Sequence, residues 1–293
     1  MTNHYQAKIL LNAQARLGEG AIWHPTERKL YWVDIEGKML HVFDPESGED
    51  KSYDVTERIG TVVPTMAGGA ILALQNGIAL FDLSTGEMTH KLDPEEHIPG
   101  NRFNDGKCDP MGNLWVGSMA LDEKDPVGSV YKVKPDFSFE KMISGVTVSN
   151  GICWSLDGDV MYYIDSPTRR VVAYDFRMDK ASISNPRTVI KVADHMGFPD
   201  GMTIDQNGML WVALWGGAAV GCWNPETGEL IRKIEVPAPH VTSCAFGGKN
   251  LDKLYITSAR QGLSQAQLDN YPHSGDLFVA EVGIRGVEAD LFG

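Results

Sequence analysis

Short hydrophobic segments recur along the whole chain at a nearly constant spacing. Six of them share one pattern, four residues long and largely apolar or aromatic. Their starts, at residues 30, 70, 114, 161, 210 and 254, are separated by 40, 44, 47, 49 and 44 residues. Such residues are typical of a strand buried between neighbours. The segments are Leu30–Val33, Ala70–Ala73, Leu114–Gly117, Met161–Ile164, Leu210–Ala213 and Leu254–Thr257.

A second apolar segment follows most of these strands and ends in a turn. Asp or Asn opens the turn and Gly closes it, as in Asp44–Gly48, Asp82–Gly86 and Asn224–Gly228. The Asp or Asn side chain caps the turn, and Gly adopts the positive φ that the last position needs. Each unit of roughly 40–45 residues is therefore expected to contain four strands joined by turns.

This repeat predicts an all-β fold, a six-bladed β-propeller with four antiparallel strands per blade. A two-sheet sandwich would not explain six copies at a near-constant spacing, and a helical solenoid would need long stretches of 3.6-residue periodicity. We expect residues 1–293 to form a single propeller domain, because all-β domains often exceed 200 residues. Lys8–Leu11 precedes the first repeat and is expected to add a strand to the last blade, which removes an exposed edge.

The chain is acidic, with 26 Lys and Arg against 39 Asp and Glu and a net charge of −13. Nucleic acid and anionic membranes are recognised mainly by Lys and Arg, so neither is an expected partner. The start of the sequence lacks the pattern of a secretory signal, and no apolar run reaches the length of a membrane span. We therefore expect a cytoplasmic location. The cysteines are far apart and are expected to be free, buried thiols: Cys108, Cys153, Cys222 and Cys244.

Polar residues occupy one recurring position of the repeat, ten or eleven residues before the apolar segments. This position begins the innermost strand of each blade, so its residues are expected to form a ring at one end of the central channel. Two carboxylates and two amides on such a ring suit a divalent cation. Without a cation, the repulsion between the two carboxylates would raise the pKa of one of them. The residues are Glu19, Asn104, Asn150, Asp200 and, in the last blade, Ser243.

Each of these motifs alone would more often be a plain turn than a ligand. Their shared register favours a site, and the glycines beside them allow close approach. The chain has no Gly-x-Ser-x-Gly motif, which argues against a serine hydrolase, and no glycine-rich motif for a nucleotide.

Five motifs spread from the first blade to the last make the sequence recognisable. They are Leu17–Gly20 with Trp23, Asn101–Gly106, Ser149–Gly151, Pro199–Met202, and Phe246–Gly248 with Ala259–Arg260. With them, essentially the whole chain resembles the gluconolactonase/regucalcin (senescence-marker-protein) family of six-bladed propellers. Two further stretches, Trp211–Gly217 and Ala259–Ser264, are similar to its bacterial sugar-lactonase members.

The resemblance implies a set of site residues. Glu19, Asn150 and Asp200 match the family's metal ligands, and Arg102 and Asn104 match its substrate-contacting positions. Asp122 corresponds to a position where members often carry an acidic residue. The resemblance also implies one divalent cation (Ca²⁺, Zn²⁺, Mg²⁺, Mn²⁺ or Fe²⁺) and a small-molecule sugar lactone as substrate, which is hydrolysed to the aldonic acid.

The chemistry of these residues is compatible with that activity. A divalent cation polarises a lactone carbonyl and activates the attacking water. Arg102 and Asn104 offer donors to substrate hydroxyls or to the developing oxyanion. Asp200 is the expected general base, although a pure ligand role fits the same pattern. The alternative is a non-catalytic propeller that binds a metal or a protein partner, and hydrolysis of organophosphate esters is a third, minor interpretation.

Overall fold

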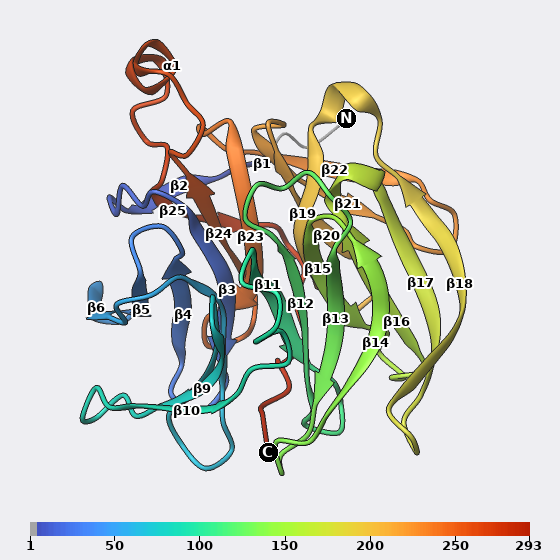
Figure 1. Ribbon diagram of the computed structural model, residues 1–293. Helices are drawn as coiled ribbons and strands as arrows, with labels where there is room; N and C mark the ends of the chain where they lie inside the picture. The colour runs from blue at the N-terminus through green and yellow to red at the C-terminus, as the bar shows by residue number, and fades with distance from the viewer. Residues whose placement is uncertain (1–4) are drawn as a thin grey trace.

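The computed structural model describes residues 5–293, which form an all-β, propeller-like structure of antiparallel sheets (Figure 1). In this part of the chain, helical structure is confined to α1 (Gln265–Asn270) and the 3₁₀ turns η1 (Ser166–Thr168) and η2 (Asp194–Met196). None of the helices described is long and apolar enough to cross a membrane.

Four of the sheets consist of four consecutive strands each. Their strands are β3 (Gly18–His24), β4 (Lys29–Asp34), β5 (Met39–Asp44) and β6 (Glu49–Asp54); β7 (Ile59–Pro64), β8 (Ala70–Leu74), β9 (Gly77–Phe81) and β10 (Met88–Leu92); β11 (Asn101–Cys108), β12 (Leu114–Ala120), β13 (Gly128–Val133) and β14 (Phe139–Val146); and β15 (Ser149–Trp154), β16 (Val160–Asp165), β17 (Arg170–Arg177) and β18 (Ser182–Lys191).

The remaining nine-stranded sheet joins two sets of strands. One set is β19 (Phe198–Ile204), β20 (Leu210–Trp215), β21 (Ala219–Trp223) and β22 (Leu230–Glu235), with β1 (Tyr5–Gln6) parallel to β22; the other is β23 (His240–Gly247), β24 (Lys253–Ala259), β25 (Leu277–Glu281) and β2 (Lys8–Leu11). Trp215 of β20 lies opposite His240 of β23 and connects the two sets. Because β2 pairs with β25, the prediction that Lys8–Leu11 adds a strand to the last set of strands is confirmed.

The six predicted apolar segments all lie in second strands, namely β4, β8, β12, β16, β20 and β24. Trp115 and Trp211 in two of these strands are fully buried between sheets. Their indole N–H groups donate to Asp109 and Asp205, each at 2.8 Å. Both carboxylates also accept backbone N–H groups of the preceding turn and so fix the turn that leads into the strand. The four cysteines are free and buried, as predicted.

The first strands contact one another in a closed order: β3, β7, β11, β15, β19, β23 and again β3. Glycines allow these strands to approach closely. A Cβ added to Gly60 would lie 2.4 Å from the Phe103 carbonyl oxygen, and one added to Gly151 would lie 2.7 Å from the Asp200 carbonyl oxygen. Because no side chain separates these backbones, residues far apart in the sequence meet on one ring.

Candidate functional site

A cavity of about 230 Å³ lies at the end of the ring where the first strands begin. Five of the six predicted site residues line it, and each is at most 6% exposed. They come from β3, β11, β15 and β19: Glu19, Arg102, Asn104, Asn150 and Asp200. The recurring position in the repeat thus brings together residues that are up to 181 positions apart in the sequence.

The two carboxylates in this cavity are strongly perturbed. Burial raises the pKa of Glu19 to about 8; the nearby Asp105 carboxylate adds to this effect, and the Gly20 N–H and the Arg102 guanidinium oppose it. Burial also raises the pKa of Asp200 well above its usual value, with further contributions from Glu19 and Asp105. Two buried acids this close together are costly in their doubly ionised form, and the one guanidinium beside them, Arg102, does not offset the effect of burial.

One oxygen of this pair has an unmet bonding capacity. Oδ1 of Asp200 is buried and finds no hydrogen-bond partner among residues 5–293. Glu19 Oε2 accepts only the N–H of Gly20, at 3.1 Å, in the same part of the chain. Buried acceptors are normally satisfied, so these oxygens indicate a ligand that the protein itself does not provide.

The Asn150 amide is held in one orientation. Its Nδ2 donates to Ser166 Oγ at 2.8 Å, and Ser166 Oγ in turn donates to the Pro199 carbonyl at 2.6 Å. Its Oδ1 accepts from Asn104 Nδ2 at 2.9 Å. An amide oxygen has two acceptor positions, so Oδ1 keeps one for a further ligand.

Asn104 links Asn150 to Arg102. Both of its Nδ2 hydrogens are used, because Nδ2 donates to Asn150 Oδ1 and, at 2.7 Å, to the Ser149 carbonyl. Its Oδ1 accepts from Nη1 of Arg102, which also donates to the Phe103 carbonyl at 3.1 Å. Asn104 therefore has no amide hydrogen left for a substrate and orients its two neighbours, whereas Arg102, which lines the cavity, uses only Nη1 in these bonds.

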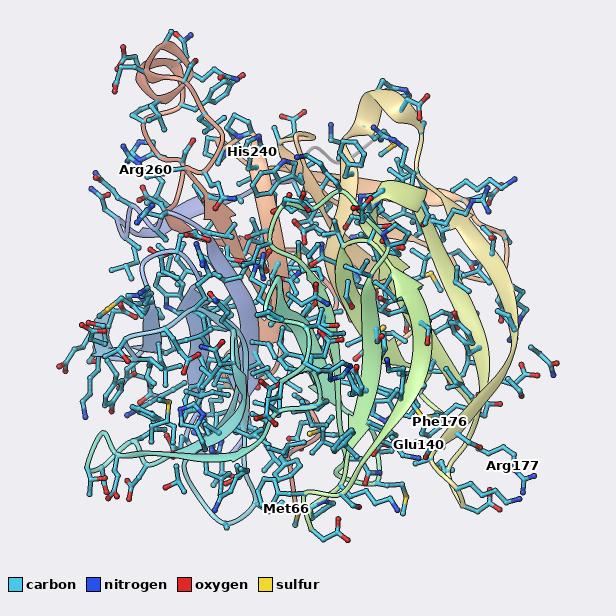
Figure 2. All side chains as sticks on the ribbon, viewed as in Figure 1. Met66, Glu140, Phe176, Arg177, His240 and Arg260 are labelled. Carbon is cyan, nitrogen blue, oxygen red and sulfur yellow. The ribbon has the colours of Figure 1, made fainter. Side chains whose placement is uncertain are left out.

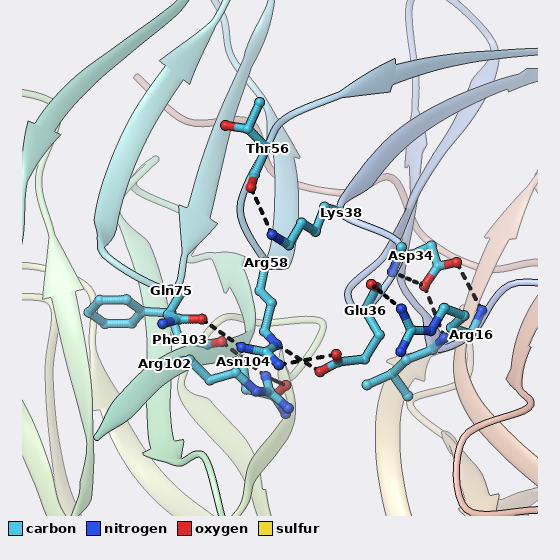
Figure 3. Close-up of polar contacts among 12 residues, drawn as sticks. Arg16, Asp34, Glu36, Lys38, Thr56, Arg58, Gln75, Arg102, Phe103 and Asn104 are labelled. Atoms are coloured by element: carbon cyan, nitrogen blue, oxygen red, sulfur yellow. Dashed lines mark hydrogen bonds and ion pairs between the residues drawn. The ribbon is translucent and has the colours of Figure 1, made fainter. Parts of the chain in front are cut away.

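Charged residues from the loops of β4 and β7 flank Arg102 (Figure 3). Arg58 forms a two-point ion pair with Glu36, at 2.8 Å and 3.2 Å, and also donates to Gln75 at 2.8 Å. Asp34 accepts the N–H of Leu17 at 3.0 Å and so fixes the chain just before Glu19. These contacts, which the sequence did not indicate, hold Glu36 and Arg58 to each other beside Arg102.

Asp122 does not line the cavity. Its side chain is 57% exposed and lies 3.5 Å from the Lys124 ammonium group. The next residue, Glu123, lines the cavity instead and has a φ of 60°. Burial lowers the pKa of Arg102, and the negative charge of Glu123 is the largest influence that opposes this decrease. The loop thus presents an acidic residue one position later than the resemblance implied, because the turn at Glu123 changes which side chain faces inward.

One wall of the cavity, formed by Phe198, Trp215 and Gln261, is largely aromatic and was not recognised as part of the site from the sequence. Phe198 and Trp215 lie directly opposite each other in β19 and β20, and both line the cavity together with Gln261. The available signal was positional: Phe198 lies two residues before Asp200, on the strand that carries it. Trp215 and Gln261 stood in motifs similar to bacterial lactonases, but no role followed from that.

The donor set fits an oxygen-preferring divalent cation. It offers carboxylate oxygens from Glu19 and Asp200 and the free acceptor position of Asn150 Oδ1. The described part of the chain holds no group of three or more His, Cys, Asp or Glu side chains placed to bind one ion. The set is therefore small and all-oxygen, which suits hard or borderline cations and leaves coordination positions for other ligands.

Comparisons with known proteins agree with this picture. Residues 17–260 match the family model described as the SMP-30/Gluconolactonase/LRE-like region. A Bacillus subtilis (strain 168) protein, provisionally named sugar lactone lactonase YvrE, is 38% identical over 282 residues, which cover 96% of this chain and 97% of that protein. Regucalcin of Danio rerio is 36% identical over 285 residues, or 96% of each chain.

The fold is shared with solved structures as well. A calcium-binding protein, regucalcin, from Agrobacterium tumefaciens strain C58 superposes with a TM-score of 0.94 at 27% identity, covering 99% of this chain and 98% of that one. The sequence match spans most of the chain, and the structural match spans nearly all of it. The chain therefore belongs to the SMP-30/gluconolactonase/regucalcin family.

Proposed function

We propose that this protein is a metal-dependent lactonase that hydrolyses a sugar lactone to the aldonic acid. The observation that carries the proposal is the buried pair Glu19 and Asp200 beside the Arg102 guanidinium, with an Asp200 oxygen that has no partner among residues 5–293. A pure scaffold gains nothing from burying two carboxylates in this way. The names of the relatives support the same activity, since one is called a sugar lactone lactonase.

The proposed metal ligands are Glu19, Asn150 and Asp200. When bound there, a divalent cation would supply Lewis acidity to the lactone carbonyl and to an attacking water. The calcium-binding description of a structural relative supports a divalent cation and leaves its identity among Ca²⁺, Mg²⁺, Mn²⁺, Zn²⁺ and Fe²⁺ open. Asn104 and Ser166 orient the Asn150 amide for this role, because ligands are more effective when their partners fix them.

The chain's own residues then have separate tasks. Arg102 donates to the carbonyl oxygen as negative charge develops on it, or to a neighbouring hydroxyl. Asp200, whose Oδ1 has no partner among residues 5–293, accepts a proton from the attacking water as general base and returns it to the ring oxygen as the acyl C–O bond breaks. Glu123 takes the place expected for Asp122 and accepts hydrogen bonds from substrate hydroxyls at the cavity wall.

The same proposal includes the finer architecture. We take the nine-stranded sheet as two blades joined at Trp215 and His240, which gives six blades around one channel. The closed order of contacts among the first strands supports this division. One domain then covers residues 1–293, of which residues 1–4 lie outside the described part.

A metal-reconstitution assay tests the function. The protein is stripped with a chelator and given one divalent metal at a time, and the opening of glucono-δ-lactone and related lactones is followed in a pH-stat. We expect no hydrolysis above the uncatalysed rate without metal and recovery with at least one ion. Glu19→Gln should lose metal affinity but keep its fold. The matched control Glu46→Gln, in the exposed β5–β6 turn, should behave like wild type.

Full activity after verified metal removal would overturn metal dependence. Metal binding with no hydrolysis of any lactone would instead favour the non-catalytic propeller.

A further inference from the structure

We propose that Trp215 and Gln261 recognise the ring of the substrate and that His240 positions both of them. In this arrangement Trp215 packs against the C–H face of a neutral, hydroxylated ring, and Gln261 Oε1 accepts a hydrogen bond from one ring hydroxyl. The proposal rests on the lactonase function proposed above and names the feature of the lactone that this wall selects.

Trp215 is held by a stacked ring. It ends β20 and lies directly opposite His240, the first residue of β23. The two ring centroids are 4.0 Å apart and the planes differ by 14°. His240 lies at the same end of the molecule as Arg260 and α1, away from Met66 and Phe176 at the other end (Figure 2). With one indole face covered in this way, Trp215 borders the cavity as a fixed apolar surface.

Gln261 is anchored through its backbone and leaves a side-chain acceptor unused. Its N–H donates to the Arg16 carbonyl at 2.9 Å, and its own carbonyl accepts from His240 Nδ1 at 2.9 Å. Gln261 lines the cavity, and its Oε1 is buried and has no hydrogen-bond partner among the described residues. A buried acceptor without a donor is costly, and a ligand hydroxyl would remove that cost.

His240 links the two recognition groups. A carbonyl oxygen can only accept, so His240 Nδ1 carries the proton in its bond to Gln261. The same ring stacks on Trp215, and burial lowers the pKa of His240, which keeps the imidazole neutral near pH 7. One side chain therefore sets both the angle of the indole and the position of the Gln261 backbone.

The chemistry of this wall defines the ligand. Phe198 is backed by the Arg169 guanidinium, 3.8 Å from its ring centroid, so the wall holds two fixed aromatic rings and an amide. This wall contributes no charged group to the cavity lining; the charged lining residues Glu123 and Arg102 are not part of it. Aromatic faces pack against apolar faces, and an amide acceptor requires a donor. A neutral ring with hydroxyl groups meets both requirements, while a ring without hydroxyls meets only the first.

Two lactones of the same ring size test this assignment: glucono-δ-lactone, which carries ring hydroxyls, and δ-valerolactone, which carries none. We expect Gln261→Leu to lower kcat/KM for gluconolactone about 2- to 10-fold, the value of one hydrogen bond, through KM. The same variant should leave kcat/KM for δ-valerolactone unchanged. Trp215→Leu should raise KM for both lactones. His240→Leu should raise KM for gluconolactone, and His240→Phe, which restores a stacking ring, should recover part of that loss.

The chain offers a matched control in a second His–Trp stack. His41 and Trp32 stack with centroids 3.9 Å apart, on β5 and β4 and outside the cavity lining. His41→Leu should change stability but neither KM. Equal effects of Gln261→Leu on the two lactones, or unchanged KM values in both the Gln261 and the Trp215 variants, would overturn the proposal.

Direct binding separates this proposal from the catalytic one. Glucono-δ-lactam, whose ring nitrogen makes it slow to open, can be titrated calorimetrically into wild type, Gln261→Leu and His240→Leu. If wild type opens no lactone, the lactonase function fails, and the lactam titration still decides the role of the wall. Weaker lactam binding in both variants supports ring recognition, and unchanged binding in both contradicts it. If His240→Leu does not fold, Gln261→Leu and Trp215→Leu still give a decisive result.

Discussion

Replacing Gly151 with alanine should damage the site through the backbone, without removing any polar group. Gly151 follows Asn150 in β15 and packs against β19. The added Cβ would lie 2.7 Å from the Asp200 carbonyl oxygen, 2.7 Å from Met202 Cβ and 2.9 Å from Ile164 Cδ1, whereas ordinary contacts begin at 3.4 Å. The main obstacle is backbone and cannot rotate away. The two strands must therefore separate by about 0.7 Å, which is the difference between the 2.7 Å contacts and an ordinary contact of 3.4 Å. A close-packed interior transmits this displacement to the residues on both strands.

The size of the effect follows from this displacement. Overpacking of a well-packed interior costs about 1–3 kcal/mol, so the free energy of unfolding should fall by that amount. The strands that separate carry Asn150 and Asp200, two of the proposed metal ligands. Since a misplacement of about 1 Å can cost roughly 100-fold in rate, we expect kcat/KM to fall about 10- to 100-fold and metal affinity to weaken.

Urea unfolding, calorimetric metal titration and pH-stat kinetics measure the three quantities on one preparation. Gly100→Ala is the matched control, because a Cβ there meets no atom within 4 Å and its φ is not left-handed. The control should stay within about 0.5 kcal/mol of wild type or gain slightly in stability. If Gly151→Ala binds metal and turns over like the control, then the close packing of β15 on β19 does not set the geometry of the site.

Three further predictions concern the acidic residues. Asp200→Asn should still bind metal but stay about 10²–10⁴-fold slow at saturating metal, as measured by steady-state kinetics; wild-type turnover there would leave Asp200 a ligand only. Glu123→Gln should raise KM for the lactone while Asp122→Asn should not, and the reverse result would restore Asp122 to the site. The raised pKa of Glu19 should make the metal-free protein lose stability as pH rises from 4.5 to about 8, because the folded state binds the proton more tightly than the unfolded state. Tm measured with and without metal across this range should show that the stabilisation by the metal grows with pH.

Most of the fold was accessible from the sequence because the repeat is explicit. The apolar segments mark second strands, and counting back from them locates the start of the first strands, where Glu19, Asn150 and Asp200 lie. Their convergence follows from the closed order of first strands, which needs no knowledge of individual contacts. The division of the nine-stranded sheet was less visible, because the pair Trp215 and His240 joins two sets that the repeat treats as separate.

The rest of the site depends on details that a repeat cannot encode. Glu123, rather than Asp122, lines the cavity, and its left-handed backbone lies in a loop outside the repeat register. Asn104 lies at a ring position, yet its hydrogens are used by Asn150 and by a backbone carbonyl, which only the packed structure reveals. Gln261 lies in the segment between β24 and α1 and becomes visible as a candidate through its Oε1, which has no hydrogen-bond partner among the described residues.

We propose that one cation, bound by Glu19, Asn150 and Asp200, is required for lactone hydrolysis. The most direct measurement titrates metal-stripped protein with Ca²⁺ or Mn²⁺ and follows bound metal and the rate of gluconolactone opening in the same samples. The rate should rise in proportion to bound metal and level off at one ion per chain, and Glu19→Gln should shift both curves together to higher metal concentration. A rate that is already maximal before any metal binds, or that stays at the uncatalysed value when the site is full, would contradict metal-dependent hydrolysis at this site.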